Sequence, residues 1–551
     1  MADKPFIQLN SRDNVLIALE NLEPGRRITF KGMDFGLKNH VPAKHKFTIA
    51  ELQTGDPVIM YGILVGKALE KIPRGSLITV GNTTHAEEEY SVEPRRFKWE
   101  APDISRWTPS TFLGYYRPDG RVGTANYWLV IPLTFCENRN VDVLKAALTE
   151  SLGYSGEKDF LVDIRPLIQK FKAGHGMDDI LQTDILHDRR EISGNRIFRN
   201  VDGIKFLNHE GGCGGTREDS GLLCSLLAGY ITHPNVGGAT VLSLGCQHAQ
   251  IRLIQDEIKK IDPSFGKPLV ILEQQAYHSE KVFLTDAIKR TFTGLMEADK
   301  SIRKPAPISK LSIGLECGGS DGFSGISANP TIGYVADLIV ALGGIAILSE
   351  FPELNGVEQE LLNRCVSRDL AEKFASLMKQ YSDRAIAIGS GFDNNPSPGN
   401  IRDGLITHTM KSAGAARKGG TSPITDVLDY TERASIPGLN LLCTPGNDVE
   451  STTGLAASGA SIILFSTGLG TPTGNPVCPV VKVSSSTSLF ERMNDIIDFD
   501  TGSIITGNET IRSLGEKMLD YVIEVASGVK TPAAVRSGQD DFIPWKRGIS
   551  L

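Results

Sequence analysis

The chain lacks any apolar run of about 18 residues, which is the length that a membrane-spanning helix needs. Its first residues show no apolar core of the kind that defines a secretory signal peptide. Lysine and arginine occur in runs of at most two, and the formal net charge is −7, which argues against a surface for nucleic acid or anionic lipid. These absences predict a cytoplasmic protein that engages neither nucleic acid nor a membrane.

Short cysteine pairs and phosphate-binding motifs are also missing. None of the eight cysteines stands in a Cys-x-x-Cys pair, so a zinc ribbon is not expected. In a reducing compartment such cysteines are more often free, metal-bound or catalytic than disulfide-bonded. The Walker pattern is absent, and the stretch 468–470 is followed by proline rather than by a helix, which argues against a dinucleotide site.

What the chain does contain is a change of pattern along its length. Residues 1–90 alternate short apolar runs with Gly and Pro turns, which predicts a small β-rich domain with one short helix after Asp13. Residues 91–112 are rich in charged and aromatic side chains without periodicity and predict a linker along a surface. Apolar runs then alternate with helical stretches, which predicts Rossmann-like parallel α/β sheets in two catalytic subdomains, 113–305 and 306–551.

The predicted strands are short, continuous apolar runs, as expected for strands buried on both faces. They cover residues 127–135, 204–207, 239–244, 269–272, 311–315, 345–348, 385–388, 440–442 and 461–465. The clearest predicted helices are 141–150, 251–261, 280–291 and 359–380. Ligands of open parallel sheets bind outside the carboxyl ends of the strands, so the residues after these runs are the first candidates for a site.

Five of the eight cysteines follow such runs. The richest strand end carries Glu316, Cys317, Ser320 and Asp321 among glycines that let a ligand approach the backbone. The other four cysteines are Cys136, Cys213, Cys246 and Cys443. Packing is the ordinary role of a free cysteine. Cysteines on neighbouring strand ends could instead ligate iron or an iron–sulfur cluster.

Two histidines and three polar loops add further candidates. His209 precedes Cys213 in a glycine-rich segment, where structural and functional roles are equally open, whereas His45 taken alone would be a surface histidine. The loops 394–400, 444–448 and 466–475 offer hydroxyls, amides and backbone N–H groups. Such groups suit a polyhydroxylated or carboxylated small molecule.

Together these segments resemble the altronate dehydratase and galactarate dehydratase family of sugar-acid hydro-lyases, over nearly the whole chain and in one order. The residues that carry the resemblance are Asp13-Asn14, His45-Lys46-Phe47, Arg117-Pro-Asp119-Gly-Arg121, His233-Pro-Asn235, Leu244-Gly245-Cys246, Glu316–Gly322, Asn395–Asn400, Pro445–Asp448 and Asp498-Phe499-Asp500. Altronate dehydratase is the nearer match, because its sequence also has Gly438-Leu-Asn-Leu-Leu before Pro-Gly-Asn-Asp. The resemblance implies an N-terminal SAF-type domain, a large α/β catalytic region, and Fe²⁺ or Mn²⁺ as the expected metal.

The chain departs from the family at five charged or histidine positions. These are Ala125 and Leu469 in place of arginine, Gln247 and Thr409 in place of glutamate, and Gly81 where a histidine is expected. Arginine is the usual partner of a substrate carboxylate. Either these positions are peripheral, or the chain represents a subgroup with altered handling of substrate or metal.

The implied reaction is dehydration of D-altronate to 2-dehydro-3-deoxy-D-gluconate, with a base, an acid and a metal acting as Lewis acid. The expected metal ligands are Cys136, Cys213, Cys246 and Cys317. The expected acid–base residues are His45, His209, Glu316 and Asp321. The expected substrate contacts are Ser320, Asn400, Lys411, Asn447 and Thr467.

Other readings of the same residues remain open. They are dehydration of galactarate or another sugar acid, a lyase that expels sulfite from sulfolactate, and a sugar-acid sensor without catalysis. The partner expected in each case is a small sugar acid. Whether the chain forms a homo-oligomer is also left open.

Overall fold

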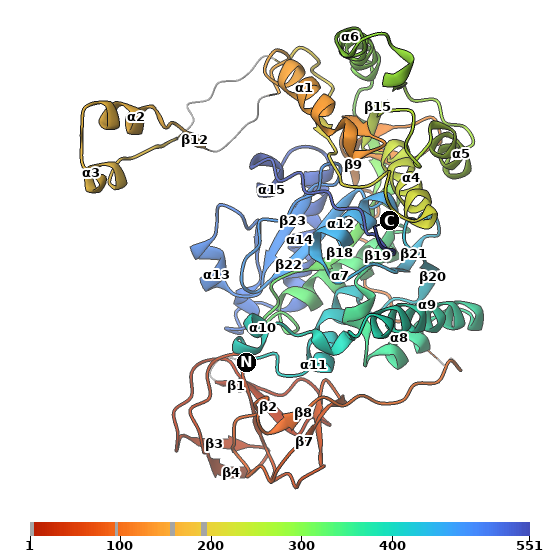
Figure 1. Cartoon of the computed structure of the whole chain (residues 1–551). Helices are drawn as coiled ribbons and strands as arrows, with labels where there is room; N and C mark the ends of the chain where they lie inside the picture. Colours follow the sequence, from red (N-terminus) through yellow and green to blue (C-terminus); the bar gives the residue numbers. More distant parts are fainter. Residues whose placement is uncertain (1–4, 94–96, 155–159, 189–195, 551) are drawn as a thin grey trace.

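The computed structural model describes residues 5–93, 97–154, 160–188 and 196–550. They form a small β-rich body, a four-stranded α/β body and a larger seven-stranded α/β body, in chain order (Figure 1). The predicted fold class, a β-rich N-terminal domain followed by parallel α/β sheets, is confirmed. No helix in these ranges is both long and apolar enough to cross a bilayer.

Short antiparallel strands build the first body, at the bottom of Figure 1. They are β1 (Phe6–Ile7), β2 (Val15–Ala18), β3 (Arg27–Phe30), β4 (Met33–Gly36), β5 (Lys46–Thr48), β6 (Pro57–Met60), β7 (Ile63–Ala68) and β8 (Thr83–Thr84). The helix predicted after Asp13 is wrong, because Val15–Ala18 is wholly buried and pairs with β1 and β5 on either side. Asn14 accepts a hydrogen bond from the N–H of Ile59 instead of capping a helix.

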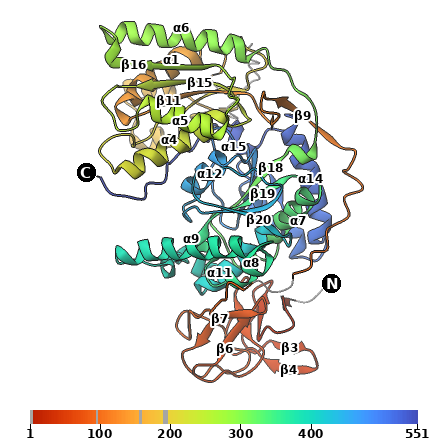
Figure 2. The ribbon, with the colours of Figure 1, turned by 90° about the vertical axis from the view of Figure 1, so that its right-hand side faces the viewer.

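The second body is a four-stranded parallel sheet with helices on both faces (Figure 2). Its strand order is β14 (Gly203–Phe206), β11 (Tyr127–Pro132), β15 (Val236–Ser243) and β16 (Leu269–Glu273). Helices α1 (Asn138–Thr149) and α6 (Glu280–Ala298) share one apolar cluster with the sheet. Helices α4 (Arg217–Thr232) and α5 (Ile251–Ile261) share another on the opposite face.

The third body is a seven-stranded parallel sheet. Its strand order is β20 (Ile424–Leu428), β21 (Gly438–Leu442), β19 (Ile345–Leu348), β18 (Ser312–Cys317), β22 (Ile462–Thr467), β23 (Val480–Ser484) and β24 (Phe499–Asp500). Helices α7 (Ala328–Ala341) and α14 (Ile511–Ala526) pack on one face. Helix α12 (Asp448–Ala457) lies on the other face and joins the apolar cluster of α4, so the two sheets share a core.

The remaining helices line the carboxyl edge and the periphery of this sheet. They are α8 (Glu358–Arg364), α9 (Arg368–Ala387), α10 (Pro398–Arg402), α11 (His408–Ala415), α13 (Thr487–Arg492) and α15 (Ala533–Arg536). The strand predicted at 385–388 is wrong, because these residues end α9 and continue just beyond it. Ile386 and Ile388 are 64% and 83% exposed, so this apolar run is not a buried strand.

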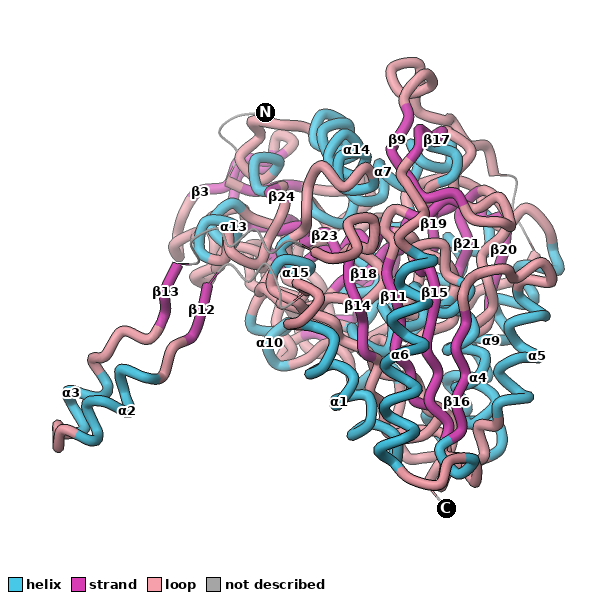
Figure 3. The backbone as a smooth tube through the Cα atoms, turned by 90° about the horizontal axis from the view of Figure 1, so that it is seen from above, coloured by secondary structure: helices cyan, strands magenta, loops and turns pink. Residues whose placement is uncertain are grey.

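Two smaller features connect or extend the bodies. A small antiparallel sheet of β9 (Thr111–Tyr116), β10 (Val122–Gly123) and β17 (Lys304–Pro307) joins the two α/β bodies. An arm of β12 (Phe160–Val162), α2 (Arg165–Lys172), α3 (Met177–Leu181) and β13 (Leu186–Asp188) projects away from the second body (Figure 3). No residue of α2 or α3 is buried.

Candidate active site at the carboxyl edge of the large sheet

Adjacent strands β18 and β19 carry a cluster of acids around a thiol. β18 ends near Glu316 and Cys317, the turn after β19 carries Glu350 and Glu353, and all four are buried. Cys317 Sγ lies 3.3 Å from Glu353 Oε2 and 3.9 Å from Glu350 Oε1. In the described part of the chain, Cys317, Glu350 and Glu353 are the one group of His, Cys, Asp or Glu whose ligand atoms all lie within 4.8 Å of one another.

Two lysines compensate the negative charge of this cluster. Lys418, in the 3₁₀ turn Ala416–Gly419, donates to Cys317 Sγ at 2.7 Å and to Glu350 Oε2. Lys411, on α11, donates to Glu353 Oε1 at 2.6 Å. Because a buried charge without a partner is strongly destabilising, each lysine is needed to keep its glutamate in the core.

The environment separates the protonation states of the thiol and its nearest carboxylate. Burial alone would raise the pKa of Glu353, but Lys411 and Lys418 outweigh it and lower the pKa to about 2. Burial and the neighbouring Glu350 raise the pKa of the Cys317 thiol well above its usual value. An ionised carboxylate therefore lies beside a thiol that keeps its proton at neutral pH.

Two further carboxyl groups, those of Glu316 and Asp448, have raised pKa values. Glu316 Oε2 accepts hydrogen bonds from Ser349 Oγ at 3.0 Å and Ser451 Oγ at 2.6 Å. Burial and Glu350 raise the pKa of Glu316 well above its usual value. Burial and Glu350 also raise the pKa of Asp448, at the start of α12, to about 7. A carboxyl group with a pKa near neutral pH is suited to general acid–base catalysis.

Glycines leave room for these groups at the end of β18. A Cβ added at Gly318 would lie 2.1 Å from Asp448 Oδ2, and one added at Gly468 would lie 2.3 Å from Asp321 Cγ. Real contacts of a Cβ with another heavy atom are much longer, so any other residue would push the carboxylates away. Glycine is therefore required at positions 318 and 468, because Asp448 and Asp321 approach the backbone closely there.

The donor set around Cys317 fits a divalent transition metal. A thiolate selects iron or zinc and carboxylates accept iron or manganese. The lysines hold Glu350 Oε2 and Glu353 Oε1, so the other oxygen of each carboxylate faces the sulfur. Lys418 also contacts the sulfur and would have to shift when an ion binds there.

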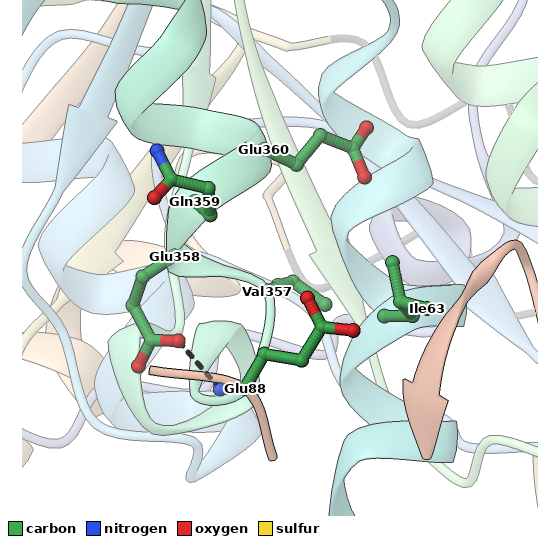
Figure 4. A pocket seen from close by; sticks show the side chains of 7 residues that line it. Ile63, Glu88, Val357, Glu358, Gln359 and Glu360 are labelled. Carbon is green, nitrogen blue, oxygen red and sulfur yellow. Dashed lines mark hydrogen bonds between the residues drawn. The ribbon is translucent and has the colours of Figure 1, made fainter. Parts of the chain in front are cut away.

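A separate small pocket lies between the first body and α8 (Figure 4). It is lined by Ile63, Glu88, Gly356, Val357, Glu358, Gln359 and Glu360. Glu358 Oε2 accepts a hydrogen bond from the N–H of Gly356 at 2.7 Å, so the Glu358 carboxylate points toward the backbone at Gly356 (Figure 4). Three glutamates with no lysine or arginine in the lining would repel a carboxylate substrate, so this pocket is a poor place for a sugar acid.

Asp321 lies apart from the acid cluster and tethers the first body. Its Oδ2 pairs at 2.9 Å with Lys44, which also pairs with Asp403 at 2.9 Å. The carbonyl oxygen of Lys44 would lie 2.5 Å from a Cβ at Gly322 and at Gly404, so it is clamped between two glycines. The first body is therefore fixed to the loop that follows Cys317. A catalytic role for Asp321 stays a prediction.

The two predicted histidines also lie outside the cluster around Cys317. His45 is half-buried beside Lys44, its Nδ1 lies 3.2 Å from the carbonyl oxygen of Ala43, and burial lowers its pKa. His209 is in the second body, where Nε2 lies 2.7 Å from the carbonyl of Pro132 and Nδ1 accepts from the N–H of Gly211 at 3.1 Å. Burial lowers the pKa of His209 to about 4. Acid–base roles for either histidine stay predictions.

Of the predicted substrate contacts, Lys411 belongs to the acid cluster, and the others support local structure. Asn400 donates to the carbonyl of Ser320 at 2.7 Å and closes a capping box of α10. Asn447 caps α12. Thr467 Oγ1 accepts from the N–H of Gly470 at 2.9 Å. Contacts of these residues with a substrate stay predictions.

The four cysteines predicted as metal ligands are divided between two sheets. Cys317 is in the third body, whereas Cys136, Cys213 and Cys246 follow β11, β14 and β15 of the second body. Those three do not share a close ligand group with Cys317 in the described residues.

Sequence reasoning missed Glu350, Glu353 and Lys418, and it assigned no role to Asp448. The two glutamates follow the apolar run 345–348, so the same strand-end argument that found Cys317 would have found them. Lys418 stands in a short turn between a helix and a strand, where no sequence pattern marks it.

Three consecutive parts of the chain match models of known protein families. Residues 4–86 match the altronate/galactarate dehydratase SAF domain, residues 114–299 the D-galactarate dehydratase/altronate hydrolase second domain, and residues 308–550 the D-galactarate/altronate dehydratase C-terminal domain.

Full-length relatives are found as well. The chain is 32% identical to an altronate dehydratase of Bacillus subtilis over 100% of both chains. It is 31% identical to an altronate dehydratase of Escherichia coli, covering 99% of this chain and 100% of the relative. It is 29% identical to a galactarate dehydratase (L-threo-forming) of Escherichia coli, covering 95% of this chain and 93% of the relative. The chain therefore belongs to the altronate and galactarate dehydratase family of hydro-lyases.

Proposed function

We propose that the chain dehydrates a sugar acid at the site around Cys317, and that its main substrate is D-altronate, converted to 2-dehydro-3-deoxy-D-gluconate. The observation that carries the proposal is the buried group of Cys317, Glu350 and Glu353, paired with two lysines at the carboxyl edge of the large sheet. The names of two full-length relatives, both altronate dehydratases, support the choice of substrate.

Elimination of water needs a base for the weakly acidic proton next to the carboxylate and an acid for the departing hydroxyl. Asp448, with a pKa raised to about 7, can accept the proton at neutral pH. Glu316, whose raised pKa keeps it protonated, can protonate the hydroxyl as it leaves. Each such proton transfer contributes roughly 10²–10⁴-fold to the rate.

The remaining charged groups can bind the substrate carboxylate and a divalent ion. Lys411 is a cation at the rim of the cluster, where a substrate carboxylate can share it with Glu353. A divalent ion, when bound, would be held by Cys317, Glu350 and Glu353 and would act as a Lewis acid toward the substrate oxygens.

The direct test is turnover. Protein purified without oxygen and supplied with Fe²⁺ or Mn²⁺ should release a 2-keto-3-deoxy acid from altronate, followed by NMR. Absence of product from every aldonate and aldarate tried under these conditions would overturn the proposal.

A matched pair of variants tests the role of Asp448. Asp448→Asn should lower kcat by about 100-fold or more, because the amide cannot accept the proton. Asp426→Asn is the control, since Asp426 is also half-buried, has a pKa raised by burial, and lies on β20 of the same sheet away from Cys317. Equal effects of the two changes would remove Asp448 from the mechanism.

Galactarate is the second candidate substrate, because a galactarate dehydratase aligns over nearly the whole chain at 29% identity. The two differ in having one or two terminal carboxylates. A comparison of kcat/KM for altronate and galactarate with the same preparation decides between them.

A further inference from the structure

Three cysteines gather at the carboxyl edge of the smaller sheet. Strands β14, β11 and β15 are adjacent and parallel, and the loops that follow them carry Cys213, Cys136 and Cys246. Because the strands run the same way, the three loops emerge at one edge.

Backbone contacts lock these loops together. The N–H of Phe135 donates to the carbonyl of Gly211 at 3.1 Å, and the N–H of Ala249 donates to the carbonyl of Gly212 at 3.1 Å. A Cβ at Gly212 would lie 2.0 Å from the carbonyl oxygen of Leu133, and Gly212 has a φ of +95°. The loop of Cys213 is therefore wedged between the loops of Cys136 and Cys246.

The exposure of these cysteines argues against a packing role. Cys136 and Cys246 are exposed and Cys213 is half-buried, whereas the other five cysteines are buried. Free cysteine is among the most buried residue types, and its chemistry rather than its packing explains an exposed position.

A second observation points to a ligand beside Cys136. Thr134 and Glu137 flank it and are both 0% exposed. Thr134 Oγ1 and Glu137 Oε1 have no hydrogen-bond partner in the described residues. A buried polar atom left unpaired destabilises the fold unless a ligand or an ion pairs with it.

The separation of the three thiols argues against a single ion as their ligand. They do not converge within 4.8 Å, as ligands of one ion would. An iron–sulfur cluster spreads its cysteine ligands over several irons and so accepts thiolates that are further apart. We propose that Cys136, Cys213 and Cys246 bind an iron–sulfur cluster, separate from the site around Cys317.

The chemistry of this site follows from its three ligands. Each thiol loses its proton on binding, so cluster assembly releases protons. With three cysteines, a four-iron cluster has one iron without a cysteine ligand, and this iron is open to an oxygen ligand. The inference does not rest on the proposed dehydration.

The test measures iron and acid-labile sulfide in the full-length protein purified without oxygen. We expect about three or four irons and a matching amount of sulfide per chain, with visible absorbance and an EPR signal after reduction or oxidation. Cys136→Ser, Cys213→Ser and Cys246→Ser should each lower the sulfide content by more than half. Cys224→Ser is the control, because Cys224 is buried in α4 of the same body.

Thiol labelling gives a result that does not depend on how the variants fold. In the purified protein, Cys136 and Cys246 should resist alkylation despite their exposure, and should become reactive once iron is removed by oxidation and chelation. Iron without sulfide, zinc in place of iron, or equal labelling before and after chelation would overturn the cluster. None of these results would affect the test of altronate turnover.

Discussion

The two parallel sheets of this protein place cysteines at the same kind of position and surround them differently. Cys317, after β18, is buried and contacts Glu350, Glu353 and Lys418. Cys246, after β15 of the smaller sheet, is exposed. Both thiols follow the end of a parallel strand. Side chains from distant segments of the chain surround Cys317 with charge, whereas Cys246 stays exposed.

Of the changes that test this comparison, replacing Lys418 should have the largest effect on activity. Lys418→Met leaves Glu350 buried without its cation, so activity should fall by about 1,000-fold or more, and the thermal midpoint should drop. Lys482→Met is the control, because Lys482 is equally buried on β23, at the far side of the sheet from β19. Comparable losses in both variants would show that any buried lysine matters, not this one.

Exchanging sulfur for oxygen separates Cys317 from another buried cysteine of the larger sheet. Cys317→Ser should lower turnover by about 100-fold and reduce bound divalent metal, because a hydroxyl is a poor substitute for a thiolate ligand. Cys443→Ser should change turnover less than about twofold, since Cys443 is buried after β21, which β19 separates from β18, and lies outside the ligand group. Full activity and metal content in Cys317→Ser would remove this cysteine from the site.

Loss of the tether from the first body should have an intermediate effect. Lys44→Met leaves the buried Asp321 without its cation and loosens the loop after Cys317, so kcat should fall by roughly 10- to 100-fold. Lys38→Met, at an exposed position of the same body, should behave as wild type. If kcat and KM of Lys44→Met equal those of the wild type, the loop after Cys317 holds its position without the tether.

The smallest effect concerns the smaller sheet and depends on pH. His209 has its pKa lowered by burial to about 4, whereas an unfolded histidine titrates near 6.5. The unfolded state therefore binds a proton that the folded state does not, and stability falls as pH drops from about 6.5 to 4, by about 3 kcal/mol in total. His209→Gln should show a smaller drop in thermal midpoint between about pH 7 and pH 5. An identical pH dependence would indicate that other groups control acid stability.

The sequence predicted all four strands of the smaller sheet and the four central strands of the larger one, because buried parallel strands are recognisable as apolar runs; it missed β20, β23 and β24. Of the nine predicted strands, 385–388 is wrong, since a short apolar run at the exposed end of α9 looks the same as a strand. The helix prediction for Val15–Ala18 is wrong because four apolar residues are too short a run to show the period that distinguishes a helix from a strand.

The site was predicted less completely than the fold. Cys317 and Glu316 were found because they end an apolar run, and Lys411 through the family resemblance. Lys418 was not found, because it lies 101 residues from Cys317 along the chain and only the folded sheet brings the two together. The division of the four cysteines between two sheets likewise depends on strand order, which a single sequence does not specify.

Glu350 shows what such a site demands of the protein around it. It adopts a left-handed backbone conformation, φ 65° and ψ 55°, which costs a residue other than glycine about 1 kcal/mol or more. Its neighbours add mutual repulsion among buried acids. A redesign that selected only for heat resistance would therefore replace the residues at this edge first, and would trade activity for stability.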